Sequence, residues 1–353
     1  MQHNMLREIH EQPKAVGDTL QQEFKQARTV LQELDAPKIT MVYFTGSGTS
    51  YHACLAANYV LSALTRISST TLPASEFSSW VKKSGQPGTI TVALSQSGES
   101  VDVLAAIRSA SDAGMRTIGI TNSDHSSLGK QTEFQLFGRA GEEKALAATK
   151  SYTATLAAAY ALVMELAHSL SPDSESIELL EQGLRNAADQ MQLTLTLSED
   201  QARILASKFA GKQLHFMLGS GPNYPTALEG ALKLKECCNL YAEGFATREF
   251  LHGPMQLVDS RTPVFLLEGP KESEQVAQLG KSFLKFGAPT VVIKRRGGEI
   301  MEEGCDTIYV ARDIEELFSP LVYVIPLQLY AFYSALERGL NPDSPVKLTK
   351  VVK

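Results

Sequence analysis

A short glycine and serine turn occurs twice in this chain of 353 residues, each time directly after an apolar run. Ile39 to Phe44 leads into Thr45-Gly46-Ser47-Gly48-Thr49-Ser50, and Leu214 to Leu218 leads into Gly219-Ser220-Gly221-Pro222, 173 positions later. A continuous apolar run is typical of a central parallel strand that is covered on both faces. Because helical stretches follow both turns, the pattern predicts two tandem α/β domains, each a doubly wound, flavodoxin-like parallel sheet.

The linker signal Ser171-Pro172-Asp173-Ser174 separates the two copies. We therefore predict an N-terminal helical segment at 1–34, a first domain at 35–170, a second domain at 171–335 and a tail at 336–353. Pro13 is expected to divide the helical segment into two pieces. Further strands are expected at 89–93, 116–121, 134–137, 263–267 and 289–294, and helices at 145–166, from the linker to about 209, and up to 240.

A second hydroxyl-rich turn, Leu94-Ser95-Gln96-Ser97-Gly98-Glu99-Ser100, follows the apolar run Thr89 to Ala93 and opens a helical stretch. Free backbone N–H groups at a helix start favour an anion, and a glycine lets the backbone approach it. Two such turns at neighbouring parallel strands flank one crevice, which predicts a phosphate site. A single turn of this kind is more often a plain serine N-cap. The third glycine of a dinucleotide fingerprint is absent.

The second copy lacks these hydroxyl groups, since Glu268-Gly269-Pro270-Lys271-Glu272-Ser273 stands in their place. It carries acid and base candidates instead: Glu236 in the helical stretch 232–236, and then Glu243, Glu249 and His252. Moving a proton between adjacent sugar carbons requires a carboxylate close to both, for which Glu236 is the first candidate. The residues alone leave open a solvated ion pair of Glu236 with Lys233 and an ordinary loop histidine at 252.

The formal net charge of −6 gives no basic field, so neither nucleic acid nor an anionic membrane is expected as a partner. Four cysteines without metal-ligand spacing fit a reducing compartment and predict no bound metal. The chain opens without a signal-like segment and has no run of 18 apolar residues, so we expect a cytoplasmic protein.

Several motifs in this order resemble the double sugar-isomerase (SIS) domain family over nearly the whole chain from Arg7: TGSGTSYHA, ALSQSGES, AATKS, ALKLKE, YAEGF, REFLHGPMQL and SPVKLTKVV. Within the family the likeness is to the isomerase half of glucosamine-6-phosphate synthases and to standalone glucosamine-6-phosphate deaminases. The resemblance implies two SIS domains, a phosphosugar substrate, no cofactor, and a homodimer.

The resemblance also implies roles for single residues. Glu236 falls on the carboxylate that moves the proton between C1 and C2, His252 on a ring-opening histidine donated across the dimer interface, and Lys350 on a tail lysine that forms an imine. The positions that hold the sugar phosphate are Ser47, Gly48, Thr49, Ser50, Ser95, Gln96, Ser97, Ser100 and Ala148. Ser100 replaces the more usual Thr, Ala148 replaces a Ser, and the tail departs from the usual P-R-N-L-A-K.

No nucleophilic cysteine follows Met1, and the first cysteine is Cys54. Without a tethered source of ammonia, mass action favours deamination, so the expected activity is conversion of glucosamine 6-phosphate to fructose 6-phosphate and ammonia. The alternatives are a fructosamine-6-phosphate deglycase, another ketose/aldose phosphosugar isomerase, and a sugar-phosphate sensor without catalysis. A bulky substituent in a deglycase would need a wide mouth near Ala148, Glu243 and Lys347.

Overall fold

The computed structural model describes residues 3–81, 85–172, 174–269, 272–297 and 303–350, which form two compact units. The β1 unit holds residues 11–143 and 148–185 together with the end of the tail from Thr349. The β6 unit holds the chain up to His10, the short stretch 144–147 and residues 186–348. Helix α1 (Asn4–Leu34) contributes residues to both units.

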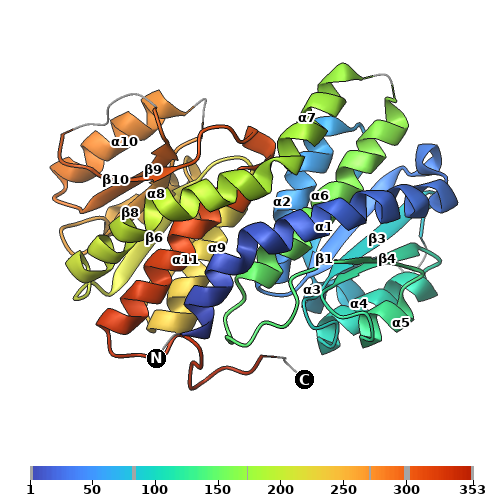
Figure 1. Cartoon of the computed structure of the whole chain (residues 1–353), viewed down its shortest axis with the longest axis horizontal. Helices are drawn as coiled ribbons and strands as arrows, with labels where there is room; N and C mark the ends of the chain where they lie inside the picture. The colour runs from blue at the N-terminus through green and yellow to red at the C-terminus, as the bar shows by residue number, and fades with distance from the viewer. Residues whose placement is uncertain (1–2, 82–84, 173, 270–271, 298–302, 351–353) are drawn as a thin grey trace. The chain divides into compact units, whose positions relative to one another are not determined.

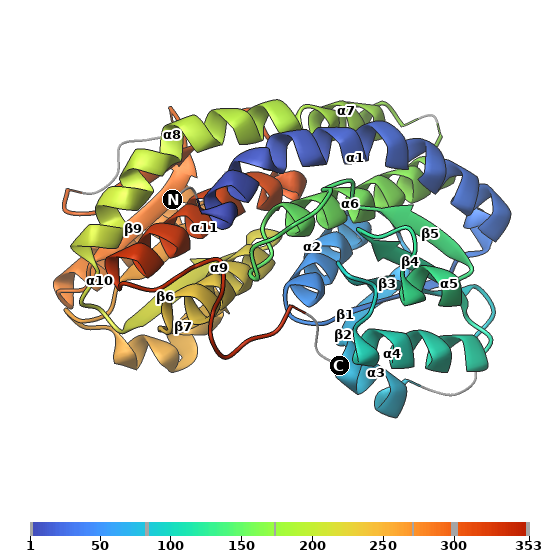
Figure 2. The same cartoon turned by 60° about the horizontal axis from the view of Figure 1, so that its bottom comes forward.

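The β1 unit is built on a parallel five-stranded sheet with the order β2-β1-β3-β4-β5. Its strands are β1 (Met41–Gly46), β2 (Ser68–Pro73), β3 (Thr89–Leu94), β4 (Arg116–Thr121) and β5 (Phe134–Phe137). One face carries α2 (Thr49–Leu64) and α6 (Lys150–Leu170). The other carries α3 (Ala74–Trp80), α4 (Val101–Asp112) and α5 (Ser127–Gln131), as Figure 2 shows. All six residues of β3 are buried, as expected for a strand between two helical layers.

The β6 unit repeats this plan with the order β7-β6-β8-β9-β10, again entirely parallel. Its strands are β6 (Leu214–Gly219), β7 (Tyr241–Ala246), β8 (Val264–Leu267), β9 (Thr290–Arg295) and β10 (Asp306–Val310). On one side lie α8 (Ala187–Lys208), α11 (Pro320–Glu337) and α9 (Asn223–Cys238), and on the other α10 (Ser273–Lys285) (Figure 1). Strand orders that correspond one for one confirm two tandem doubly wound α/β domains.

Short 3-10 helices occur in both units. Helices η2 (Glu249–His252) and η3 (Pro254–Leu257) follow β7, and η4 (Glu316–Phe318) precedes α11, while η1 (Ala36–Lys38) precedes β1 in the other unit. Phe250 of η2 packs with Phe216 and Phe283 in the core beneath α10. This core fixes the start of the loop that carries His252.

Two helical stretches are long and apolar enough to cross a membrane by length and composition, Lys150–Leu170 and Glu316–Glu337. In each, most of the apolar window is buried inside the structure, 83% and 89% respectively. Helix α6 packs on α2, and α11 packs between α8 and α9. Both are therefore central core helices of their own units.

The structure corrects three sequence predictions about helices. Helix α1 runs unbroken from Asn4 to Leu34 with Pro13 inside it, because one missing backbone hydrogen bond is offset by burial of its apolar positions, from Met5 to Leu34. Helix α6 begins at Lys150 rather than at 145, since nearby backbone N–H groups bond to carboxylates instead of helix carbonyls. The stretch up to 209 is two helices, α7 (Glu175–Arg185) and α8, which break at Asn186.

The sequence analysis missed strands β2, β7 and β10 and helices α3, α5, α10 and α11. Strands β2, β7 and β10 lie away from the centre of their sheets and carry polar residues, so they lack the apolar runs that mark β1 and β6. Helix α11 is apolar all round and carries Pro326 inside, so it lacks an amphipathic period. The domain boundaries remain a prediction, and Asp173 of the linker lies outside the described residues.

Candidate functional site

The two hydroxyl-rich turns of the β1 unit leave adjacent parallel strands. Strands β1 and β3 pair in register, with Thr45 opposite Ala93, so both turns emerge at the same carboxyl edge. Space between them is tight, because a Cβ on Gly46 would lie 3.1 Å from the Leu94 carbonyl oxygen. The two turns therefore lie next to each other at the usual ligand position of an open α/β sheet.

The second turn is held in shape by its own backbone and by the turn after β4. Ser95 Oγ accepts the Gly98 N–H at 3.1 Å, and the Gln96 carbonyl accepts the Asn122 N–H at 3.0 Å. Gly98 has φ +67°, and a Cβ there would lie 2.4 Å from the Ser126 Cβ. Only glycine tolerates both the positive φ and the lack of room for a Cβ, so the turn is preorganised.

Both turns end at helix starts. Gly48, with φ 53°, is the N-cap of α2, and Ser100 is the N-cap of α4 but its side chain makes no capping hydrogen bond. Ser100 therefore occupies the N-cap position without capping the helix through its side chain. Exposed or half-buried hydroxyl groups surround the two helix starts, from Ser47, Thr49, Ser50, Ser97 and Ser100. Donors and two helix dipoles directed to one edge suit a phosphate.

Glu236 belongs to a charged triad on one face of α9 in the β6 unit. Lys233 is fully buried, and its Nζ lies 2.5 Å from Glu236 Oε2 and 3.3 Å from Glu229 Oε1. Burial alone would lower the pKa of Lys233, but the two carboxylates raise it above its ordinary value, so the ammonium persists. Glu229 is also fully buried, whereas the Glu236 side chain is 20% exposed. The solvated ion pair considered from the sequence is therefore wrong: the lysine is in the core.

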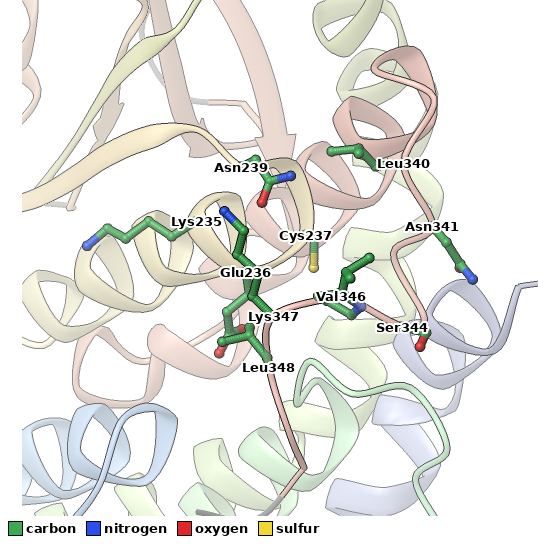
Figure 3. Close-up of a pocket in the computed structure, with 11 residues that line it drawn as sticks. Lys235, Glu236, Cys237, Asn239, Leu340, Asn341, Ser344, Val346, Lys347 and Leu348 are labelled. Carbon is green, nitrogen blue, oxygen red and sulfur yellow. The ribbon is translucent and has the colours of Figure 1, made fainter.

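Glu236 also lines a pocket between the end of α9 and the tail segment 340–348 (Figure 3). Asn239, Ser344 and Lys347 contribute polar side chains to it, while Lys235 extends away from the tail in this view. The carboxylate thus faces a buried cation on one side and a cavity on the other. This arrangement suits a carboxylate that is held in place by an ion pair and can still reach a ligand.

The other acid and base candidates of this unit are exposed. Glu243 lies on the edge strand β7, Glu249 begins η2, and His252 ends it beside Gly253, which has φ +142°. The structure therefore does not gather them around Glu236 within the unit. An exposed His252 is accessible to a second copy of the chain, and its donation across an interface stays a prediction.

Lys350 lies in the β1 unit, where its Nζ donates to Glu143 Oε2 at 3.1 Å. Glu143 is a fully buried carboxylate that the sequence analysis did not single out, although it stands just before the AATKS motif. Ala148 is half-buried and directly precedes Thr149, the N-cap of α6. Over the described ranges, no three His, Cys, Asp or Glu side chains gather as a metal site would require.

The SIS domain family matches this chain twice, at residues 38–165 and 209–338. Curated relatives include glutamine–fructose-6-phosphate aminotransferases (isomerising) of Clostridium tetani, 35% identical over 359 residues, and of Mycolicibacterium smegmatis, 36% identical over 361 residues. Both alignments cover 99% of this chain but only 59% and 57% of the relatives. The chain thus spans less than two thirds of their length.

Solved structures resemble the chain over almost all of its length. The C-terminal domain of glucosamine-fructose-6-phosphate aminotransferase from Francisella tularensis has 26% identity and a TM-score of 0.90, covering 97% of this chain and 98% of that one. A glucosamine-6-phosphate deaminase from Thermotoga maritima has 25% identity and a TM-score of 0.79, with 99% of both chains covered. The paired family match and these likenesses agree with the duplicated fold, and the chain belongs to the SIS domain family.

Proposed function

We propose that this protein is an enzyme that binds a phosphorylated amino sugar and releases its amine, a glucosamine-6-phosphate deaminase that yields fructose 6-phosphate. The observation that carries the proposal is Glu236, a carboxylate paired with the buried Lys233 and open to a pocket. Binding alone does not require such a group. A solved deaminase that matches 99% of both chains supports this substrate.

The phosphate would be anchored at the carboxyl edge of the β1 sheet. The start of α4 would supply backbone N–H groups there, and the serine and threonine hydroxyl groups of both turns would supply further donors. A dianionic phosphate held in this way fixes one end of the open-chain sugar. The reacting end is then restricted in position, which lowers the entropic cost of reaction.

The proposed chemistry moves one proton from C2 to C1 and one from the amine nitrogen to the C1 oxygen, and then hydrolyses one C=N bond. His252 assists opening of the sugar ring, and Glu236 takes the C2 proton and delivers it to C1. The aldose amine becomes a 2-imino sugar whose C1 is an alcohol. Water then adds to C2 and ammonia leaves, directly or after Lys350 has formed its own imine at C2. Proton transfer by a positioned carboxylate contributes roughly 10²–10⁴-fold to the rate.

The test is an assay of purified protein with glucosamine 6-phosphate, in which ammonia and fructose 6-phosphate are measured together. We expect equimolar products, and a loss of about 100-fold or more in kcat for Glu236→Gln. Glu243→Gln, an exposed carboxylate on an edge strand, is the matched control and should retain turnover. Absence of ammonia from the wild type, or full activity in Glu236→Gln, would contradict the proposal.

The relatives named as isomerising aminotransferases favour a second candidate, the reverse amination of fructose 6-phosphate. The same protein incubated with fructose 6-phosphate and ammonium salt distinguishes the two directions. If glucosamine 6-phosphate is formed and no ammonia is released in the other direction, the activity is amination rather than deamination.

We also propose a homodimer that acts in the cytoplasm, where buried thiols such as Cys54, Cys237 and Cys238 stay reduced.

A further inference from the structure

Glu143 is a buried carboxylate with an unusually complete set of donors. Its side chain is fully buried, and Oε1 accepts the backbone N–H groups of Thr149 at 2.9 Å and of Ser151 at 3.1 Å. Oε2 accepts Ser151 Oγ at 2.6 Å and Lys350 Nζ at 3.1 Å. A buried carboxylate is tolerated only when its oxygens are satisfied in this way.

Three of the four hydrogen-bond donors are accounted for by capping of α6, and the fourth, Lys350, is not. Thr149 and Ser151 belong to the first turn of α6, where a carboxylate satisfies orphan N–H groups and interacts favourably with the helix dipole. Lys350 comes from the tail, 207 positions along the chain, and its side chain is 31% exposed. Helix capping needs no such lysine, so this contact calls for a separate reason.

The hydrogen bonds show that Glu143 is the fixed partner and that Lys350 is the one it restrains. Glu143 is fixed by three hydrogen bonds from a helix start, whereas lysine is a long side chain with many rotamers on a segment near the chain end. An anion fixed in this way restricts the lysine to one location. The Thr149 N–H, which directly follows Ala148, is bound to the same carboxylate. The predicted sugar contact and the tail lysine therefore share one anchor.

We infer that Glu143 is the positioning residue of the tail: it holds the ammonium group of Lys350 at the first turn of α6, next to the loop that carries Ala148. In turnover the lysine would leave this carboxylate when it becomes the amine that attacks the sugar C2. Only this second statement rests on the proposed function. The first concerns the resting enzyme and requires no substrate.

The resting contact is tested by competitive acetylation of the full chain with acetic anhydride, followed by peptide mass spectrometry. Lys347, an exposed lysine three residues earlier in the same tail, is the internal reference. We expect the ratio of Lys350 to Lys347 acetylation to rise about fivefold in Glu143→Gln, because a charge-assisted hydrogen bond is lost. An unchanged ratio would overturn the inference.

Glu8→Gln is the matched control for loss of a buried carboxylate that accepts two backbone N–H groups. Glu8 is fully buried and accepts the backbone N–H groups of Lys144 at 2.6 Å and Ala145 at 3.1 Å. Both variants should lower the melting temperature, but only Glu143→Gln should change the acetylation ratio. An equal change in Glu8→Gln would mean that general loosening, not a specific contact, exposes the lysine, and would overturn the inference.

Turnover is examined with a double-mutant cycle of Glu143→Gln and Lys350→Met. If Glu143 acts through Lys350, kcat of the double variant should equal that of Lys350→Met, while the stability loss of Glu143→Gln persists. Additive losses in kcat would overturn the positioning role in catalysis. A wild type with no turnover would instead defeat the proposed function, and the acetylation ratio would still decide the resting contact.

Discussion

Lys233 is a fully buried lysine between two carboxylates, and one of them, Glu236, lines a pocket. The sequence shows a Lys/Glu-rich segment of the kind that is usually solvated, because charge pairs on a helix do not reveal which face is buried. Only packing decides that Lys233 and Glu229 lie inside and that Lys235, two positions on, lies outside.

Replacement of Lys233 by Met should destabilise the fold strongly. It leaves Glu229 buried beside Glu236 without their shared cation, and breaking a buried ion pair costs about 3–5 kcal/mol. Urea unfolding measures this loss, with the exposed Lys235→Met as control, which should stay within about 0.5 kcal/mol of wild type. A Lys233→Met protein as stable as the control would show that the triad does not depend on its charge.

His215 provides a pH-dependent contribution to stability. It is fully buried on β6, its Nε2 lies 2.8 Å from the Tyr330 hydroxyl, and burial, with a smaller effect of Arg338, lowers its pKa from 6.5 to about 3. Below pH 6.5 the unfolded chain binds a proton that the folded chain does not. The free energy of unfolding therefore decreases as the pH is lowered, by about 2 kcal/mol from pH 7 to pH 5.

The variant His215→Gln removes this titration, so its free energy of unfolding should change less between pH 7 and 5. Urea titrations at both pH values measure the difference, and His125→Gln, in an exposed loop, serves as control. Equal pH dependence in His215→Gln and wild type would mean that other groups cause the acid sensitivity.

The turn between β3 and α4 shows how an element is specified by one backbone position. Gly98 has φ +67° and no room for a Cβ, whereas Gly114, just after α4, has φ +77° and open space within 4 Å of where a Cβ would stand. Both glycines carry the same conformational strain on substitution, but only Gly98 adds a steric clash. Substituting each of the two glycines therefore separates the effect of backbone conformation from the effect of a steric clash.

We expect Gly98→Ala to destabilise the protein by about 1–3 kcal/mol more than Gly114→Ala, since a 2.4 Å contact must be relieved. It should also raise KM for the sugar phosphate, because the turn would shift away from the crevice. Thermal unfolding and KM measured on both variants test this. Equal effects of the two substitutions would show that the turn is not rigid.

At the scale of the whole molecule, the proposed dimer makes each site depend on two chains. Glu236 of one chain would act with His252 donated by the other, so a mixed dimer of Glu236→Gln and His252→Asn chains contains one intact site. Random reassociation should restore roughly a quarter of wild-type activity from two nearly inactive variants. The ammonia assay on mixed and separate variants measures it. Mixed dimers as inactive as their parents would show that His252 acts within its own chain.

The sequence by itself determined the duplicated α/β plan. Apolar runs mark the central strands because residues buried on both faces must all be apolar, and the hydroxyl-rich turns mark helix starts because glycine and serine suit sharp turns. From these, the strands β1, β3, β4, β5, β6, β8 and β9 and the neighbouring turns of the β1 unit were predictable. The edge strands β2, β7 and β10 and the uninterrupted α1 were not, since their conformation depends on pairing and burial rather than on local pattern.

Only the tertiary structure decided which charged groups are buried and with what they pair. Nothing local distinguishes Lys233 from Lys235, or Glu143 from Glu142, yet one of each pair is buried and the other exposed. The contact of Glu143 with Lys350 joins residues 207 positions apart. Burial and long-range pairing arise from the packing of whole elements, and they turn an ordinary carboxylate into an anchor for the tail.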